Sequence, residues 1–94
     1  MKVAKSKAKE IADTLGINLK IIPLNIWKKG LEIELEHGKI NNLTNVTDNN
    51  LLKTGKIALA HVLEDIFYYQ RLINLEKESK KFWKNKKMPS PLNQ

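Results

Sequence analysis

The chain has 94 residues, of which 41% are hydrophobic, and a formal net charge of +7. This length supports one domain with a single modest core. The sequence contains no cysteine, which excludes disulfide bonds and thiolate zinc sites. No run approaches the roughly 20 apolar residues of a membrane span, and the charged start of the chain lacks the apolar segment of a signal peptide. We therefore expect a soluble, intracellular protein without a membrane partner.

The positive charge gathers at the two ends of the chain. Residues 1–9 hold four lysines and no acidic residue, residues 76–94 hold six lysines and two glutamates, and residues 10–75 hold seven basic and eight acidic groups. The body is thus nearly neutral. Asn, Ile and Lys are abundant, which is typical of an AT-rich genome, so part of the lysine excess can reflect codon composition rather than selection for an anionic partner.

A first amphipathic helix is predicted between residues 4 and 15, where apolar residues recur at steps of three and four. Gly16 is expected to end it in the left-handed conformation. The connector that follows ends in Ile21 and Ile22, which we expect to fill the core. Pro23 then suits the first turn of a second helix.

The second helix is predicted to run to about His37 and to stop at Gly38. A polar loop, residues 39–47, follows, and Thr47 or Asp48 is the expected N-cap of a third helix. The third helix is predicted to continue through Ile66 and to be the most buried element, because its apolar residues cover a wide arc. These residues are Leu51, Leu52, Ala58, Leu59, Val62, Leu63 and Ile66.

A fourth helix is predicted from about Phe67 to about Lys86, with Tyr68, Leu72 and Leu75 directed inward. Two prolines follow in residues 88–94, which we expect to form a flexible C-terminal tail. The sequence therefore predicts an all-α fold, a compact bundle of about four helices, in one domain that spans residues 1–87 and has basic ends.

Glu34 is the most unusual residue of the second helix. At about 100° per residue it falls between two apolar strips of the helix. A buried carboxylate without a partner would cost several kcal/mol or take up a proton, so Glu34 needs a partner or a raised pKa. His61 on the third helix is the natural partner if the two helices pack side by side. Glu32 and Glu36 lie elsewhere on the helix and are expected to be solvated.

Both histidines of the chain lie three residues from a glutamate, in the pairs Glu34–His37 and His61–Glu64. A buried hydrogen-bond network that fixes helix register is the interpretation we favour, because polar groups inside a small bundle must be paired. The Glu-x-x-His spacing is also the one that bundle-type di-iron sites use, although the second pair is reversed here and further carboxylates would be needed. A metal-free acid–base pair is the third interpretation, and it would require a substrate pocket.

A second candidate site is the lysine-rich segment around Phe82 and Trp83. Lysines beside aromatic rings can bind a phosphate backbone and stack on a base, or dock on a protein partner or on a second copy of the chain. The interpretation we favour is a solvated lysine face on a helix whose Phe82 or Trp83 closes the core. Sequence-specific DNA recognition is not expected, because a helix-turn-helix pattern is missing. The candidate residues for anion or partner binding are Lys80, Lys81, Trp83, Lys84, Lys86 and Lys87.

Three blocks of the sequence, together with Glu64 and the pair Tyr68–Tyr69, carry a resemblance to a known family. The blocks are Glu34–Gly38, Thr44–Thr47 and Lys56–His61. With weaker similarity around them they cover residues 11–75 approximately. In these blocks the chain resembles a small family of uncharacterised all-helical proteins, a domain of unknown function found in bacteria, phages and large DNA viruses. The resemblance implies a shared helical fold and places His37, His61 and Glu64 in the family pattern, but it implies no activity.

The chain departs from the family pattern in two places. Ile66 stands where the family tends to have a proline, so the third and fourth helices could run on as one. The lysine-rich end from Lys77 onward falls outside the pattern, which suggests that this segment is particular to this protein.

We therefore expect a non-enzymatic accessory or interaction protein with no cofactor, and the family and the composition point to a viral source. Its partner would be a protein or a second copy of the chain. One alternative is a small helical bundle that binds a metal ion through the Glu/His cluster. Another is a non-specific nucleic-acid binder that acts through its basic termini.

Overall fold

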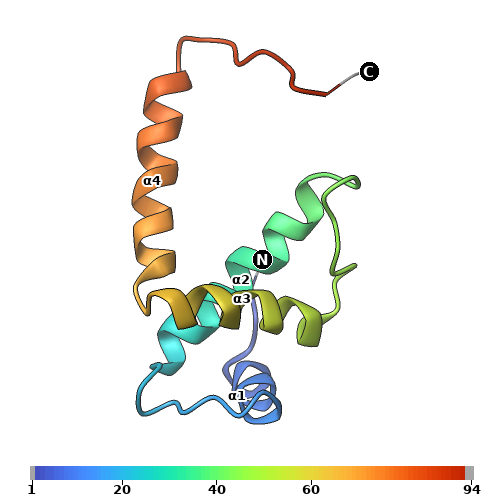
Figure 1. Cartoon of the computed structure of the whole chain (residues 1–94), viewed down its shortest axis with the longest axis vertical. Helices are drawn as coiled ribbons and strands as arrows, with labels where there is room; N and C mark the ends of the chain where they lie inside the picture. The colour runs from blue at the N-terminus through green and yellow to red at the C-terminus, as the bar shows by residue number, and fades with distance from the viewer. Residues whose placement is uncertain (1, 93–94) are drawn as a thin grey trace.

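A computed structural model describes residues 2–92, and these residues form four α-helices and no strand (Figure 1). Helix α1 spans Lys5–Thr14, α2 Leu24–Ile40, α3 Leu51–Glu64 and α4 Tyr68–Trp83. The predicted all-α bundle is confirmed. None of the helices in this part of the chain is long and apolar enough to cross a membrane. The last two residues of the predicted tail, Asn93 and Gln94, lie outside the described residues.

Helix α1 ends where the sequence predicts. Gly16 has a φ of +73°, a conformation that favours a residue without Cβ. The N–H of Ile17 donates to the carbonyl of Ala12 at 2.9 Å, and the N–H of Gly16 donates to the carbonyl of Asp13 at 3.1 Å. These two bonds form a Schellman motif, which satisfies carbonyls that the helix end would otherwise leave unpaired.

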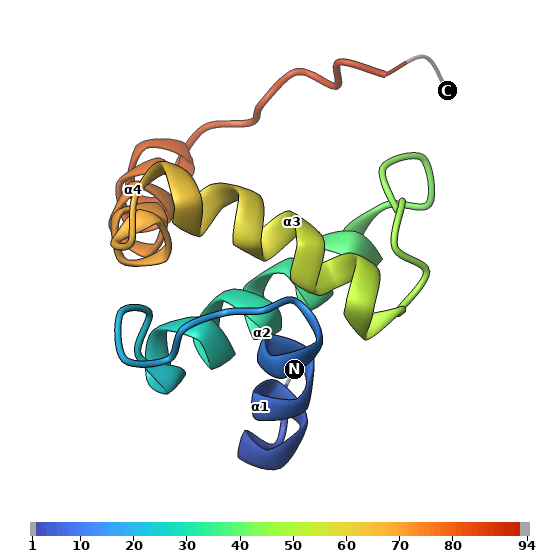
Figure 2. The same ribbon diagram turned by 60° about the horizontal axis from the view of Figure 1, so that its bottom comes forward.

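Helix α2 is the central element, and α1, α3 and α4 all pack against it (Figure 2). Trp27 and Leu31 of α2 are fully buried, and the indole N–H of Trp27 donates to the carbonyl of Ala8 in α1 at 3.0 Å. In the connector before α2, Ile22 is buried as predicted, whereas Ile21 is exposed, so the prediction for Ile21 is wrong.

The prediction that α3 is the most buried element is also wrong. Its buried face consists of Thr54, Gly55, Ala58 and Val62, whereas Leu63 is exposed. A Cβ on Gly55 would lie 2.8 Å from Cγ2 of Ile11, so α1 approaches α3 closely at this point. The small residues of α3 allow this close approach. The neighbouring helices do not cover the large apolar residues elsewhere on α3, such as Leu52 and Leu63.

Gly38 does not stop α2, which continues to Ile40. Gly38 instead makes room for the following loop, because a Cβ there would lie 2.9 Å from Oγ1 of Thr47. Thr47 is buried in this contact. A glycine near the end of a helical pattern therefore marks a close approach here, not a terminus.

Neither Thr47 nor Asp48 caps α3, contrary to the prediction. The N-cap is Asn50, whose side-chain oxygen accepts a hydrogen bond from the N–H of Lys53 at 2.9 Å. Asp48 and Asn49 precede it with positive φ values, a conformation that Asp and Asn tolerate better than most residues.

Helices α3 and α4 are separate, although Ile66 is not a proline, and α3 ends at Glu64, before the predicted end. Asp65 organises the break: its carboxylate accepts hydrogen bonds from the N–H of Phe67 at 2.9 Å and from Nε of Arg71 at 2.6 Å. Both contacts lower the pKa of Asp65. An aspartate that binds the backbone two residues later thus starts α4 without a proline.

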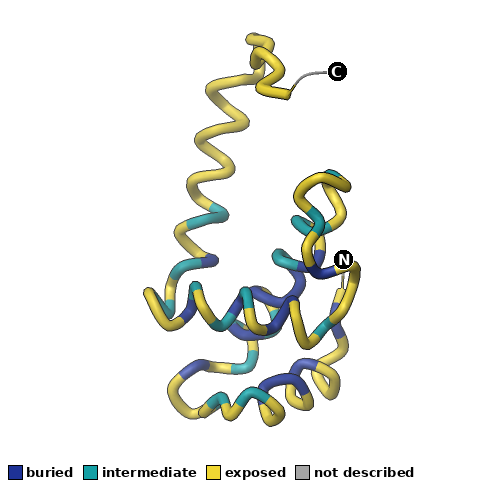
Figure 3. The backbone as a smooth tube through the Cα atoms, turned by 45° about the vertical axis from the view of Figure 1, so that its right-hand side comes forward, coloured by how far each residue is buried: buried dark blue, intermediate teal, exposed yellow. Residues whose placement is uncertain are grey.

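Helix α4 leaves the body of the protein after two turns (Figures 1 and 3). Tyr69 is buried and Leu72 packs partly buried against the core, but every residue from 74 to 92 is exposed. Leu75, predicted to point inward, is 60% exposed. Residues 84–92, which follow the end of α4, form neither helix nor strand. We call residues 68–73 the α4 base and residues 74–87 the α4 arm.

Candidate functional site

A polar cluster lies where α2, α3 and α4 meet. The side chain of Glu34 is only 11% exposed and accepts a hydrogen bond from the hydroxyl of Tyr69 at 2.7 Å. His61 of α3 lies further away, with its Nε2 4.0 Å from Oε2 of Glu34. Glu34 thus has a partner, but its direct donor is Tyr69, a residue for which the sequence analysis gave no role.

Aromatic rings enclose the other side of His61. The imidazole stacks on the ring of Tyr68, with centroids 4.1 Å apart and planes 10° apart, and the ring of Tyr69 stands edge-on to both. Within the described residues, Nδ1 of His61 is buried without a hydrogen-bond partner.

The surroundings hold both phenols in their protonated forms. Burial is the main cause that raises the pKa of Tyr69, and the hydrogen bond to Glu34 adds to it. Burial together with the charges of Glu34 and Glu64 raises the pKa of Tyr68. A phenol of raised pKa donates hydrogen bonds at neutral pH and does not act as a base, so Tyr69 serves the cluster as a hydrogen-bond donor.

Gly30 creates the space for Tyr69. A Cβ at position 30 would lie 2.7 Å from Cε2 of Tyr69, closer than real carbon atoms approach. The aromatic ring therefore packs directly on the backbone of α2. A glycine inside a helix, away from any turn, was the signal in the sequence that could have located this contact.

His37 lies outside the cluster. Its Nε2 is 3.7 Å from Oε2 of Glu76 in α4, and both side chains are partly exposed. Glu64 is exposed near the end of α3 and influences the cluster through its charge on Tyr68. Of the four residues in the predicted cluster, the structure therefore brings Glu34 and His61 together and pairs His37 with a different glutamate.

Within residues 2–92, no group of three or more histidine, aspartate or glutamate side chains is arranged to hold a metal ion. The two Glu–His pairs contribute one imidazole each and are separate from each other. Metal binding by these residues stays a prediction.

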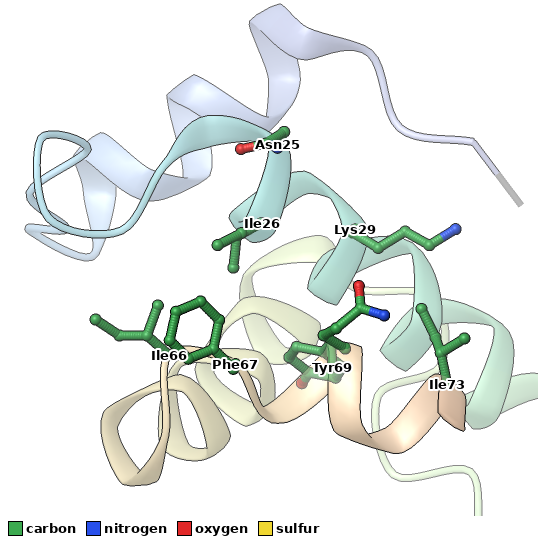
Figure 4. Close-up of a pocket in the computed structure, with 8 residues that line it drawn as sticks. Asn25, Ile26, Lys29, Ile66, Phe67, Tyr69 and Ile73 are labelled. Carbon is green, nitrogen blue, oxygen red and sulfur yellow. The ribbon is translucent and has the colours of Figure 1, made fainter. Parts of the chain in front are cut away.

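A pocket of about 510 Å³ lies beside the cluster, between the start of α2 and the α3–α4 junction (Figure 4). Ile26, Phe67 and Ile73 form much of its wall, and among the residues that the structure describes only Lys29 adds a charge to the lining. Tyr69 borders this pocket, but Glu34 and His61 do not. The pocket therefore gives a substrate no direct access to the Glu34–His61 pair.

Glu32 is buried, so the prediction that it is solvated is wrong. One of its carboxylate oxygens accepts hydrogen bonds from the N–H of Val3 at 2.7 Å and from Nζ of Lys28 at 2.9 Å. Burial alone would raise the pKa of Glu32, but these two donors outweigh it and lower the pKa. Glu32 thus fixes the segment before α1 onto α2.

The rings of the α4 arm do not close the core, and the interpretation that favoured this is wrong. Phe82 is 56% exposed and Trp83 is 36% exposed. The two rings pack edge to face with centroids 4.9 Å apart, and Nζ of Lys86 lies 3.7 Å from the centroid of the Phe82 ring. The predicted anion-binding lysines of this segment are all exposed: Lys80, Lys81, Lys84, Lys86 and Lys87.

Residues 8–78 match a family described as proteins of unknown function, DUF5661. The chain belongs to this family. The matched range contains the cluster at Glu34 and the His37–Glu76 pair, and it ends before Phe82 and Trp83. Comparison with curated proteins and with solved structures finds no match. The family membership confirms the resemblance to an uncharacterised helical family and assigns no activity.

Proposed function

We propose that the protein is a non-enzymatic interaction protein, which binds an anionic partner through the α4 arm. The observation that carries this proposal is the separation of the arm from the body: all of its residues are exposed, including Leu75, Phe82 and Trp83. The packing of α1, α2 and α3 does not require these apolar side chains. Exposed Trp and Phe on a projecting helix are typical of interaction surfaces.

The length of the exposed helix supports the same function. Short helices are marginal in water unless an apolar face packs on something. The helical part of the arm, residues 74–83, is part of a regular helix without a covered face. A partner that covers this face would supply the packing that the body does not provide.

The positive charge of the arm determines which charge a partner should carry. Residues 74–87 hold six lysines and two glutamates, a net charge of +4. Two copies of this segment side by side would repel each other, because like charges at short range are unfavourable. An anionic surface would be attracted, and the attraction should weaken as salt rises.

Trp83 provides a reporter for the test. Trp27 is fully buried, whereas Trp83 is partly exposed, so a ligand on the arm should change the fluorescence of Trp83 alone. We would titrate the protein with polyglutamate and with oligothymidylate. The expected result is a change in emission with either polymer, weaker at high salt and absent in Trp83→Phe.

Charge reversal supplies the matched control. Lys80→Glu with Lys84→Glu should weaken the binding, whereas Lys53→Glu with Lys56→Glu changes the net charge equally on exposed positions of α3 and should weaken it much less. For oligothymidylate, the arm variant should also reduce the salt slope by roughly 1.4, the value for two lost phosphate contacts to a single strand. Equal effects of the two variants, or no response to either polymer, would contradict the proposal.

A further inference from the structure

We infer that the pocket between the start of α2 and the α3–α4 junction binds a small amphipathic anion, an apolar chain that ends in one carboxylate. The pocket is lined by α2, by the α3–α4 junction and by the α4 base, so this site is separate from the α4 arm and goes beyond the proposed function. Three observations support it: apolar walls that the protein leaves uncovered, a lysine without an ion partner in the lining, and further positive charge in an adjoining hollow.

The walls of the pocket leave apolar surface in contact with water. Phe67 is 57% exposed, although it is a large apolar residue at the junction of two helices. Ile66 and Ile73 are only partly buried, and both line the pocket together with Phe67. Apolar surface in water is unfavourable, and burial of each methylene group of a ligand against it is favourable. A ligand with an aliphatic chain would therefore gain affinity from these walls.

Tyr69 gives the pocket a fixed boundary. Its side chain is buried, its hydroxyl donates to Glu34 at 2.7 Å, and its ring packs on the backbone at Gly30. A ring held in this way does not turn into the pocket and fill it. The pocket of about 510 Å³ also lies within the range of about 300–1,000 Å³ that is typical of small-ligand sites, which are mostly apolar and largely pre-formed.

The two ends of the pocket differ in polarity. Ile66 and Phe67 lie at one end, and Lys29 extends away from them at the other (Figure 4). Asn25 and Gln70 also line the pocket, and their side-chain amides can donate hydrogen bonds. Among the described residues, no aspartate or glutamate lines the pocket, and Lys29 forms no ion pair. A carboxylate near Lys29 would supply that partner while its apolar chain lies toward Phe67.

An adjoining hollow extends the positive charge beyond the pocket. The hollow has about 450 Å³, shares Asn25 and Lys29 with the pocket, and is also lined by Lys5, Lys28 and Glu32. Lys28 and Glu32 pair at 2.9 Å, whereas Lys5 forms no ion pair within residues 2–92. Lys5 and Lys29 therefore leave an excess of positive charge at this end. An anionic head group would use this charge, and a neutral or cationic one would not.

The test titrates the full chain, labelled with nitrogen isotope for NMR, with small probes. Octanoate has both the chain and the negative charge, octanol has the chain alone, octylamine has the chain with a positive charge at neutral pH, and butyrate has the charge with a short chain. We expect octanoate to bind about fivefold more tightly than octanol, the ratio that corresponds to about 1 kcal/mol for one partly exposed ion pair. Octylamine and butyrate should bind more weakly than octanoate. The amide signals of Ile26, Gly30 and Ile73 should shift, and those of residues 76–83 should not.

Two substitutions separate the head group from the chain. Lys29→Gln should weaken octanoate binding about fivefold and leave octanol binding unchanged, because it removes only the charge. Phe67→Ala should weaken both ligands by a similar factor, because it removes part of the apolar wall. Lys56→Gln, the matched loss of charge on an exposed position of α3, and the arm variant Lys80→Glu with Lys84→Glu should each change octanoate binding less than about twofold. All these positions are exposed, and circular dichroism verifies that the variants keep their helices.

The other outcomes would overturn the inference without touching the proposed function. Equal affinities for octanoate, octanol and octylamine would mean that the pocket is an apolar surface without selectivity for charge. Equal losses in Lys29→Gln and Lys56→Gln, or signal shifts confined to the α4 arm, would mean that octanoate follows the general positive charge. A dimer that Phe67→Ala dissociates would assign the pocket to a second copy of the chain. A lack of binding by every probe would leave the α4 arm as the one proposed site.

Discussion

The α4 base and the α4 arm belong to one helix, yet their surroundings are opposite. In the base, Tyr69 is buried, rests on the backbone at Gly30 and donates a hydrogen bond to Glu34. In the arm, Leu75 and Phe82 are exposed, and the lysines around them are solvated. Leu72, which lies on the same side of α4 as Leu75, packs partly buried against the core, whereas Leu75 is 60% exposed. The comparison teaches that the spacing of apolar residues defines a helix face but does not determine how far along the helix the protein covers it.

The largest expected difference between the two regions is in stability. Tyr69→Ala should lower the free energy of unfolding by about 3–5 kcal/mol, because it removes a buried ring. Phe82→Ala should change it by less than about 0.5 kcal/mol, because an exposed ring contributes little to the core. Urea unfolding of both variants measures the difference. If the two substitutions cost the same, the arm would have to pack on the body in solution.

The hydroxyl of Tyr69 can be tested separately from its ring. Tyr69→Phe should cost about 1–3 kcal/mol at neutral pH, because Glu34 stays nearly buried without its donor. The pKa of Tyr69 is raised in the folded state above the ordinary value of about 10, so its contribution is complete below pH 10 and is lost as the pH rises further.

Measuring the free energy of unfolding from pH 8 to pH 11 tests whether the contribution of Tyr69 is lost as the pH rises. The stability of the wild-type protein should fall above pH 10 more steeply than that of Tyr69→Phe. Some slope should remain in the variant, because the pKa of Tyr68 is raised as well. Identical slopes would mean that Tyr69 does not stay protonated in the folded protein.

Much of the fold could be predicted from the sequence because local signals specify it. The helical periodicity, Gly16 at the end of α1 and Pro23 before α2 all act through the backbone of a few neighbouring residues. The need of Glu34 for a partner also followed from one helix alone, since a carboxylate between apolar strips must be satisfied.

The errors concern contacts between segments that are distant in sequence. Gly38 resembled a helix end, but its role is to admit Thr47 from a later loop. The position of Glu32 on the helix predicts that it is solvated, but the N–H of Val3 donates a hydrogen bond to its carboxylate. Tyr69, and not His61, donates the hydrogen bond to Glu34 because α4 docks on that side of α2. No local sequence pattern indicates on which side α4 docks.

Gly30 tests how tightly the α4 base is fitted to α2. Gly30→Ala should cost about 1–3 kcal/mol, because its Cβ would lie 2.7 Å from Cε2 of Tyr69 and the ring would have to shift. Ser79→Ala, a change between small residues in the exposed arm, should be neutral or slightly stabilising, since alanine favours helix. Thermal unfolding distinguishes these outcomes. A stabilising effect of Gly30→Ala would show that the ring has room to move.

The smallest expected effect lies at the junction between base and arm. His37 and Glu76 are paired at 3.7 Å, but both are partly exposed, and pairs of this kind contribute from nothing to about 1 kcal/mol. His37→Ala should therefore leave global stability nearly unchanged. Because the pair holds the start of the arm beside α2, amide exchange in residues 74–83 should accelerate, by roughly twofold for a local loss of about 0.5 kcal/mol. Accelerated exchange in the α4 base as well would mean that the two regions open together and that the boundary between them is not at residue 74.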